Sequence, residues 1–551
     1  MRTITKNALI ITLAVAGLLA SQAFAAAQQG PRTVAESTDY AATSRYADVM
    51  AFVRELQRLS PLVRVETLCE SVEGRAVPLL VIGRPAPASP YGLKTDKRMV
   101  VYIQANIHAG EVEGKEASLM LARDVALGPA GACLDKLILL IAPIFNADGN
   151  ERISPENRTQ QPGPEQGVGV RPNGQNLDLN RDSMKLESPE LRGFVRNVLG
   201  RWDPALVVDC HTTDGAFHDE TVTWSWPVNP NGDLPLLEFQ RDTMLPAINA
   251  IMKDGYGASG LPYGTFRDWK APEKGWETFD PQPRYVTNYV GLRNRLSILD
   301  ENDVHADYRT RVQGNYAFLR AILDYAAEHA EELVRRVAEA DLRTVQRGLA
   351  PKATDLAAVE YELKALPGPV TIHGYETEVI ERPGTWPEMK KTDRKHIYTV
   401  PHFAEYVPKR SVRFPFAYFL PSPDAEVVGL LLRHGLLVEK LAEAASLEVE
   451  TFMPKEVKGA ERLFQGHRLN TVTGEYLTEK REFVAGTVVV RTGQPLGCLA
   501  VGLLEPESDD GLVAWNFFDR HLAGQWDRGY LPVPVHKLLA PANLVTTTIG
   551  D

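Results

Sequence analysis

Four His-x-x-Glu pairs are the first candidates for metal chemistry in this sequence. They begin at His108, His329, His373 and His402. On a helix, residues three apart lie on one face and can bind one ion, although the motif alone is a weak signal. His329 lies in a charged run typical of a solvated helix face, and no further signal surrounds the last two pairs. His108 and Glu111 follow a predicted buried strand, and strand ends are where α/β enzymes carry ligands.

A catalytic zinc ion needs three protein ligands and one position left open for water. The third ligand is predicted at the end of another apolar strand, where Ala205-Leu-Val-Val-Asp-Cys is followed by His211. His218 and His305 are the alternatives, but neither ends an apolar strand. We therefore expect His211 to complete the site begun by the first His-x-x-Glu pair.

A general base is predicted at the end of a third apolar strand, Leu296-Ser-Ile-Leu-Asp-Glu301. A metal-bound water needs such a group close by. Asp300 is the adjacent alternative. Because side chains alternate along a strand, Asp300 and Glu301 point to opposite faces, and periodicity alone does not choose between them.

Two arginines, Arg171 and Arg181, stand in the polar stretch 171–182. A guanidinium group can hold a carboxylate through two hydrogen bonds or stabilise an oxyanion. Taken alone, the stretch is better explained as a polar loop with surface arginines.

The elements around these residues predict an α/β fold. Between about residues 40 and 340, short apolar runs alternate with helical stretches, which is typical of a largely buried sheet. The expected strands are 77–82, 99–104, 137–145, 205–210 and 295–300, and the expected helices are 46–59, 111–126, 188–199 and 309–339. The long loops 150–175 and 254–283 have the length of functional loops.

Composition changes between about residues 342 and 369, where we place a domain boundary. We expect a catalytic domain over residues 26–345 and an accessory α+β domain over residues 346–551. The second domain has a β-rich pattern around one expected helix, 424–442. It carries no chemical constellation, so a structural or substrate-shaping role is expected.

Residues 1–25 have the pattern of a secretory signal peptide. Arg2 and Lys6 precede the apolar run 8–20, which is followed by the small-x-small sequence Ala23-Phe24-Ala25. The run is too short to span a bilayer, which takes about 20 residues. We expect an exported protein, periplasmic or secreted, with no membrane span in the mature chain.

Composition excludes several classes of function. The chain has 551 residues and a net charge of −11, which disfavours nucleic acid as a partner. Its four cysteines are too few and too scattered for a disulfide scaffold, and without a Cys-x-x-Cys pair no thiolate zinc site is expected. The Gly-x-Ser-x-Gly motif of serine hydrolases is also absent.

Five motifs, in order along the chain, resemble those of the zinc carboxypeptidase family, whose best-known member is carboxypeptidase A. They are Ser71-Val-Glu-Gly-Arg75, Asn106-Ile-His-Ala-Gly-Glu111, Asn146-Ala-Asp-Gly149, Asn176-Leu-Asp-Leu-Asn-Arg181 and Val207-Val-Asp-Cys-His211. The likeness covers roughly residues 40–330. It implies a mixed, mainly parallel sheet flanked by helices.

The resemblance also implies a metal site and its base. His108, Glu111 and His211 would bind one zinc ion, and Asp178 would orient His108. Glu301, rather than its neighbour, would activate the water bound to zinc and then protonate the leaving amine.

Substrate contacts are implied in the same way. Arg171 would polarise the scissile carbonyl, and Asn180 with Arg181 would bind a terminal carboxylate. Tyr289 is the candidate for the family's mobile tyrosine that closes over the substrate, and Tyr285 is the second choice.

These observations predict an exported zinc metallocarboxypeptidase that acts on peptides or proteins with a free C-terminus. A zinc amidase or deacylase acting on cell-wall peptides or acylated amino acids is the alternative, and a non-catalytic binding protein of the same fold is a further one. Asn176 replaces the family's usual glycine, which affects the local turn. The C-terminal half has no counterpart in the minimal enzyme, so substrate preference does not carry over.

Overall fold

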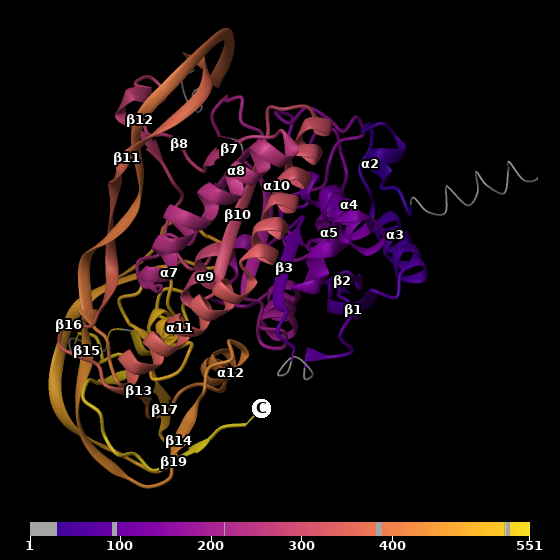
Figure 1. Cartoon of the computed structure of the whole chain (residues 1–551). Coiled ribbons are helices and arrows are strands. Elements are labelled where there is room, and N and C mark those ends of the chain that lie inside the picture. Colours follow the sequence, from indigo (N-terminus) through magenta and orange to yellow (C-terminus); the bar gives the residue numbers. More distant parts are fainter. Residues whose placement is uncertain are drawn as a thin grey trace, which may run out of the picture.

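The computed structural model describes residues 30–90, 96–213, 215–381, 388–522, 524 and 529–550. The predicted signal peptide, residues 1–25, lies outside these described residues. Figure 1 shows a mixed α/β region, from indigo to pink, followed by a β-rich region in orange and yellow.

A mixed eight-stranded sheet runs through the N-terminal half. Its strands are β1 (Val63–Glu70), β2 (Ala76–Ile82), β3 (Met99–Ala105), β4 (Leu137–Ala142), β5 (Leu206–Thr213), β6 (Val222–Ser225), β7 (Gly260–Pro262) and β10 (Leu296–Asp303). They are ordered β1-β2-β4-β3-β5-β10-β6-β7, and the four central strands are parallel. The central strands β3, β4 and β5 are buried along their whole length, which explains their continuous apolar sequences.

Helices pack on this sheet and on one another. The longer ones are α3 (Tyr46–Leu59), α4 (Glu113–Leu127), α8 (Leu245–Tyr256), α9 (Val286–Leu292), α10 (Tyr308–Glu328) and α11 (Ala330–Leu349). α10 packs against both α4 and α8. Among the described residues, no single helix has the length and apolar composition to cross a membrane. Only α4 taken together with the sharply bent turn Pro129–Asp135 meets both criteria.

Most predicted elements of this half are confirmed, although several differ in extent. β5 and β10 each run three residues beyond the predicted ends. The helix expected over 309–339 is two helices, because His329 has φ −106° and ψ 14° and interrupts α10 and α11. The strand expected over 137–145 ends at Ala142. Phe145 and Asn146 instead donate backbone hydrogen bonds to Ala105, the last residue of β3, and to Asn106, which follows it.

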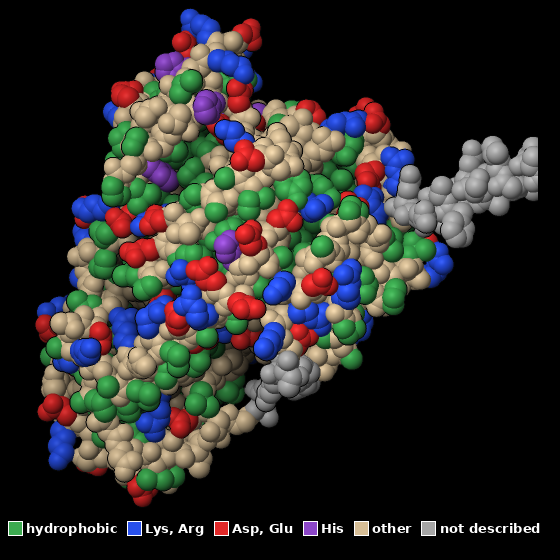
Figure 2. Space-filling model, in the orientation of Figure 1, with side chains coloured by type: hydrophobic (Ala, Val, Ile, Leu, Met, Phe, Trp, Pro, Cys, Tyr) green, Lys and Arg blue, Asp and Glu red, His purple; other side chains and the backbone are tan. Residues whose placement is uncertain are grey.

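The C-terminal half contains two antiparallel sheets. β11 (Leu356–Ile380) and β12 (Glu388–Arg413) form a long hairpin, and β12 also pairs with β9 (Trp276–Glu277), which pairs with β8 (Thr265–Phe266). This hairpin projects past the α/β region in Figure 1. On the face shown in Figure 2, acidic and basic side chains are interspersed rather than gathered by sign.

The second C-terminal sheet has seven strands in the order β16-β15-β18-β13-β17-β14-β19. They are β13 (Ala417–Leu420), β14 (Glu439–Leu441), β15 (Ala445–Gly459), β16 (Asn470–Phe483), β17 (Val488–Arg491), β18 (His536–Leu538) and β19 (Thr546–Thr548). The helix expected over 424–442 is only α12 (Ala425–Arg433), because Gly435 at φ +83° ends it and the chain then enters β14. One hydrophobic core joins residues of both halves, among them Ile103 and Trp515.

Candidate active site

Three parallel strands bring the predicted metal ligands and the predicted general base to one edge of the sheet. β3 leads into the segment that carries His108 and Glu111, β5 carries His211, and β10 carries Glu301. β5 is hydrogen-bonded to both β3 and β10, and Glu301 stands directly opposite His211 in the register. Ligands therefore gather where the carboxyl ends of neighbouring parallel strands meet.

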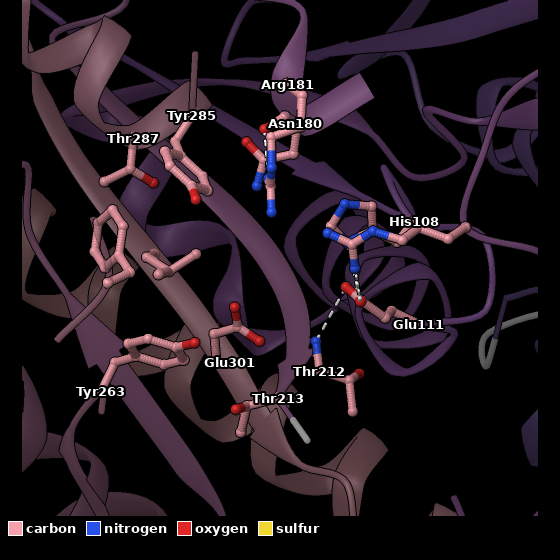
Figure 3. A pocket seen from close by; sticks show the side chains of 13 residues that line it. His108, Glu111, Asn180, Arg181, Thr212, Thr213, Tyr263, Tyr285, Thr287 and Glu301 are labelled. Carbon is pink, nitrogen blue, oxygen red and sulfur yellow. Dashed lines mark hydrogen bonds and ion pairs between the residues drawn. The ribbon is translucent and has the colours of Figure 1, made fainter. Parts of the chain in front are cut away.

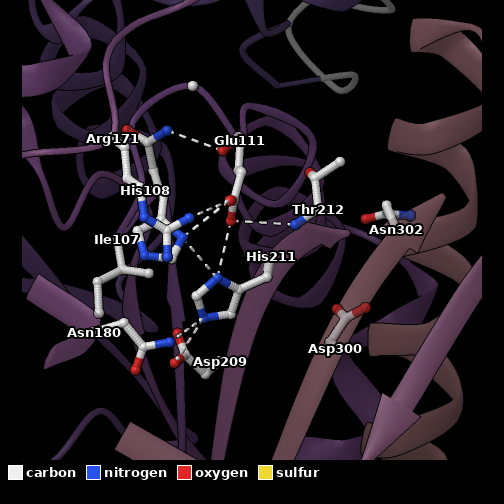
Figure 4. A network of polar contacts seen from close by, with 12 residues as sticks. Ile107, His108, Glu111, Arg171, Asn180, Asp209, His211, Thr212, Asp300 and Asn302 are labelled. Carbon is white, nitrogen blue, oxygen red and sulfur yellow. Dashed lines mark hydrogen bonds and ion pairs between the residues drawn. The ribbon is translucent and has the colours of Figure 1, made fainter. Parts of the chain in front are cut away.

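His108, Glu111 and His211 form a buried cluster whose candidate ligand atoms lie within 4.8 Å of one another. The Nδ1 atoms of the two histidines are 3.2 Å apart. Each Nδ1 also lies 2.9 Å from an oxygen of the Glu111 carboxylate (Figure 4). In a tetrahedral zinc site with bonds of about 2.0–2.1 Å, neighbouring ligand atoms are about 3.3 Å apart, so the cluster is close to the size that zinc needs.

A carboxylate stands behind each imidazole. The Nε2 atom of His108 lies 3.0 Å from Asp178, and that of His211 lies 3.0 Å from Asp209. A proton held on Nε2 by such a carboxylate leaves Nδ1 as a bare lone pair. With that tautomer, both Nδ1 lone pairs would face the Glu111 carboxylate, and the three groups would form a donor set for a cation.

Asp178 occupies the position expected for orienting His108, and its carboxylate has two further partners. One oxygen accepts from the backbone N–H of Asn180 at 3.0 Å, and the other accepts from Arg171 Nε at 2.7 Å. Although burial opposes ionisation, His108 and Arg171 hold the pKa of Asp178 well below its usual range.

Asp209 was not singled out from the sequence, although a signal was present. It precedes His211 by two residues on β5, so strand alternation places both side chains on one face. The pattern of a carboxylate two residues before a strand-terminal histidine could have identified it.

Arg158 is a second residue that sequence reasoning missed. Its guanidinium group donates to the Glu111 carboxylate from the long loop after α5 (Ala147–Asn150). A Cβ atom on Gly110 would lie 2.6 Å from Arg158 Nε, so the glycine between His108 and Glu111 makes room for this side chain. Arg158 and Glu111 lie 47 residues apart in sequence, so no local spacing predicts their contact.

Glu301 and Asp300 lie on opposite faces of β10. Glu301 lines the same pocket as His108 and Glu111, whereas Asp300 accepts from Asn315 of α10 at 2.9 Å (Figures 3 and 4). Burial raises the pKa of Glu301 to about 8, with the Glu111 charge adding to the shift and His211 opposing it. Periodicity alone does not show which of these two acids faces the pocket. The packing of the helices does, because α10 covers the face of β10 that carries Asp300.

Arg171, Asn180 and Arg181 also line this pocket of about 190 Å³. The side-chain oxygen of Asn180 accepts from the backbone N–H of Val286 at 2.9 Å, and its amide nitrogen lies 3.4 Å from His211 Nε2. Arg181 donates to the backbone carbonyl of Asn180 and stacks on the Tyr285 ring, 4.2 Å from the centroid.

Tyr289 does not reach the pocket, which corrects the first choice for a closing tyrosine. Its side chain is fully buried, and its hydroxyl contacts His434 Nδ1 at 2.7 Å and Arg293 at 3.2 Å. Tyr285, the second choice, lines the pocket, as does Tyr263, and Figure 3 shows both with Glu301. Tyr289 lies on α9 one turn after Tyr285, the residue that precedes the helix, and its side chain packs against the C-terminal half.

The two histidines considered as alternative ligands lie outside the cluster. His218 Nδ1 contacts the Glu220 carbonyl at 2.8 Å, and His305 Nε2 contacts the Gly215 carbonyl at 3.2 Å. His211 is thus the histidine that the fold brings to the first His-x-x-Glu pair.

Residues 49–193 of this chain match the zinc carboxypeptidase family. The match includes His108, Glu111, Arg171 and the segment 178–181, and it ends before His211 and Glu301. His211 and Glu301 therefore lie outside the part of the chain that the family match covers.

Sequence relatives share both halves of the chain. Carboxypeptidase 2 of Trichophyton rubrum is 21% identical over 502 residues, which cover 86% of this chain and 84% of that protein. Carboxypeptidase 2 of Trichophyton equinum is 22% identical over 525 residues, which cover 90% and 88%.

Solved structures align with about half of the chain. A metallo-carboxypeptidase from Pseudomonas aeruginosa, solved with (2-guanidinoethylmercapto)succinic acid, is 19% identical and has a TM-score of 0.37, covering 52% of this chain and 68% of that one. Carboxypeptidase A from Helicoverpa armigera is 17% identical with a TM-score of 0.38, covering 54% and 75%.

Proposed function

We propose that this protein, whose residues 49–193 match the zinc carboxypeptidase family, is an exported enzyme that removes C-terminal residues from peptides. One observation carries the proposal. A single pocket is lined by the His108–Glu111 pair, the Glu301 carboxylate and the guanidinium groups of Arg171 and Arg181. These are the groups needed to cleave an amide bond beside a free carboxylate.

His108, Glu111 and His211 would hold the zinc ion. When bound there, zinc supplies Lewis-acid chemistry toward water and a carbonyl oxygen. One zinc ion per chain is expected, because the two imidazoles and one carboxylate leave a single position open.

Glu301 is the general base and then the general acid in this proposal. Its carboxylate takes a proton from the attacking water and returns it to the leaving amine nitrogen. The raised pKa of Glu301 suits both roles, since a group that titrates near neutral pH can accept and release a proton.

Arg171 stabilises the negative charge that develops on the carbonyl oxygen. Its Nε is fixed by Asp178, and its NH1 lies 3.8 Å from Glu111, next to the proposed ligands. A positioned cation favours the charged tetrahedral species over the neutral carbonyl.

Arg181 binds the substrate's terminal carboxylate, with Asn180 beside it. Within the described residues, the one hydrogen bond that the Arg181 side chain donates goes to the Asn180 carbonyl, which leaves further guanidinium N–H groups for a ligand. Stacking on Tyr285 holds the guanidinium plane at the pocket wall.

One part of the pocket wall is aromatic and aliphatic and would suit an apolar terminal side chain, whereas Thr212, Thr213 and Thr287 line another part. Tyr263, Phe279, Tyr285 and Leu299 line the first part, and the Phe279 ring lies edge-on to both tyrosine rings. Such surfaces favour aromatic or aliphatic groups over charged ones.

Peptides that differ only at the C-terminus test the proposal. A peptide ending in a free phenylalanine carboxylate should be cleaved about 30- to 1000-fold more efficiently than its amidated twin, because the amide cannot pair with Arg181. Arg181→Ala should lower kcat/KM for the free acid and leave the amidated peptide almost unchanged.

Gln346→Ala is a matched control, because Gln346 is exposed on α11. Equal wild-type kcat/KM values for the free-acid and the amidated peptide would contradict the carboxypeptidase proposal. Cleavage of amidated peptides or acylated amino acids would then favour the amidase or deacylase alternative.

Export forms part of the same proposal and rests on the signal-peptide pattern of residues 1–25. Sequencing the N-terminus of protein recovered from the culture medium or periplasm checks it. A mature protein that begins at Ala26 is the expected result.

A further inference from the structure

The C-terminal half contacts the end of the pocket that carries Arg181 and Tyr285. Gln465 accepts a hydrogen bond from the backbone of Asp178, and Asp510 binds Arg284, the residue before Tyr285. Both contacts join segments that lie more than 200 residues apart in sequence.

The first contact is made to the residue on which this end of the site depends. The Asp178 carboxylate binds His108, Arg171 and the backbone N–H of Asn180. Its own backbone N–H donates to the Gln465 side-chain oxygen at 2.7 Å. Gln465 therefore fixes the main chain from which a proposed ligand, the oxyanion arginine and the carboxylate-binding segment are all oriented.

Gln465 is presented by a tight turn. Phe464 and His467 exchange two backbone hydrogen bonds of 2.8 and 3.0 Å, and both central residues have positive φ, +52° at Gln465 and +82° at Gly466. Glycine is usual at such positions, and a side chain kept there at a cost in strain is typical of functional sites.

The turn is anchored on both sides. His467 Nε2 contacts Glu187 at 2.7 Å, and the Phe464 ring stacks on Trp515. The Arg284 guanidinium group lies over both the Phe464 and Trp515 rings, at 5.2 and 5.3 Å from their centroids. The turn that holds Asp178 and the loop before Tyr285 thus share one aromatic cluster.

Asp510 makes the second contact. Its fully buried carboxylate accepts from the Arg284 backbone N–H at 2.5 Å, pairs with Arg284 Nε at 2.9 Å and accepts from Trp515 Nε1 at 2.9 Å. Tyr285, on which Arg181 stacks, follows directly in the chain. Asp510 therefore fixes the aromatic wall behind Arg181.

We propose that Gln465, together with Asp510, positions the end of the active site that binds the substrate carboxylate. The C-terminal half then contributes directly to the activity of the enzyme. This inference rests on the proposed function. Misplacing a substrate-binding group by about 1 Å can cost orders of magnitude in rate, so contacts that fix the main chain of 178–181 matter to turnover.

Gln465→Gly is the sharpest test variant. Glycine tolerates the positive φ, so the turn is preserved while its hydrogen-bond acceptor is removed. Gln465→Glu keeps an oxygen acceptor at the same distance along the side chain and is the rescue variant. Asp510 is left intact, because breaking a buried ion pair would destabilise the fold. Gln346→Ala controls for loss of an exposed amide.

The expected kinetic result is selective. Gln465→Gly should lower kcat/KM for a free-acid peptide by about 3- to 10-fold, the range for one hydrogen bond, mainly through KM. The amidated peptide should change by less than about twofold, and Gln465→Glu should recover most of the loss. The melting temperature should stay at or above the wild-type value, because glycine relieves the strained backbone.

Zinc binding gives a readout besides activity, since Asp178 also orients His108. The zinc Kd from chelator competition should rise in Gln465→Gly and return toward the wild-type value in Gln465→Glu. Unchanged KM and zinc Kd in Gln465→Gly would overturn the inference, as would equal losses on both peptides with a lower melting temperature. If the wild-type enzyme does not distinguish the two peptides, the proposed function fails, and the zinc Kd still decides the role of Gln465.

Discussion

In the N-terminal half, His108 and His211 each have a carboxylate behind the ring, whereas the buried His434 of the C-terminal half does not. His434 contacts the Tyr289 hydroxyl through Nδ1 at 2.7 Å and the Met184 carbonyl through Nε2 at 3.0 Å. Both of its nitrogens are satisfied in the neutral ring, and burial lowers its pKa to about 3. The first arrangement leaves lone pairs for a metal, and the second leaves none.

The His-x-x-Glu pairs of the two halves show the same difference. His373 and Glu376 stand on β11 and bind different partners, Glu220 and Arg394. Along a strand, residues three apart point to opposite faces, so the spacing that joins two ligands near a helix start separates them here. Whether a His-x-x-Glu motif can form a metal site therefore depends on the secondary-structure element that carries it.

The largest expected effect separates two neighbouring acids of β10. Glu301→Gln should lower kcat by about 10²- to 10⁴-fold while zinc content is retained, because the amide cannot accept a proton from water. Asp300→Asn should cause a small fraction of that loss. Asp300 lies on the face of β10 that α10 covers, where it accepts from Asn315, and it does not line the pocket. The reverse ranking would move the base to Asp300.

Metal binding should distinguish the histidines of the two halves. His211→Ala should weaken zinc binding by about 10³-fold, since a zinc site shares roughly 10–16 kcal/mol among its ligands. His373→Ala should keep near-stoichiometric zinc. Metal analysis after chelator dialysis measures both. Loss of metal from His218→Ala or His305→Ala, with metal retained in His211→Ala, would show that the third ligand is misassigned.

The role of the carboxylate that contacts a histidine Nε2 can be tested without changing a proposed metal ligand. Asp209→Asn should weaken zinc binding by about 10- to 100-fold, the usual cost of losing such a partner. Tyr289→Phe removes the hydroxyl that His434 contacts and should leave the zinc Kd unchanged, because that ring faces no metal site. Chelator competition on both variants decides whether the carboxylate, rather than burial alone, defines a metal-binding histidine.

The smallest expected effect concerns stability and pH. The folded pKa of His434 lies below the usual value of 6.5, so the unfolded chain binds a proton that the folded chain excludes. Stability contributed by neutral His434 is therefore complete above pH 6.5 and is lost as pH falls toward 3. The slope approaches about 1.4 kcal/mol per pH unit.

His434→Gln removes this titration. Between pH 6 and 4, the free energy of unfolding should fall more steeply in wild type than in His434→Gln, as measured by denaturant titration. Parallel curves for the two proteins would mean that His434 is protonated in the folded state.

Sequence patterns were sufficient to predict the strands that carry the site. Continuous apolar runs ending in polar residues marked β3, β5 and β10, and their ends bring His108, His211 and Glu301 together. This information is local, because a buried parallel strand must be apolar along its length and can change character only where it leaves the sheet.

Tertiary structure alone decided which face and which distant residues complete the site. Alternation placed Asp300 and Glu301 on opposite faces, but only the packing of α10 identified the covered one. The prediction that Tyr289 lines the pocket is wrong because the C-terminal half buries this residue. Gln465 contacts Asp178 although the two residues lie 287 positions apart in sequence. Contacts between distant segments depend on how elements pack, and residue types and local spacing carry no record of that packing.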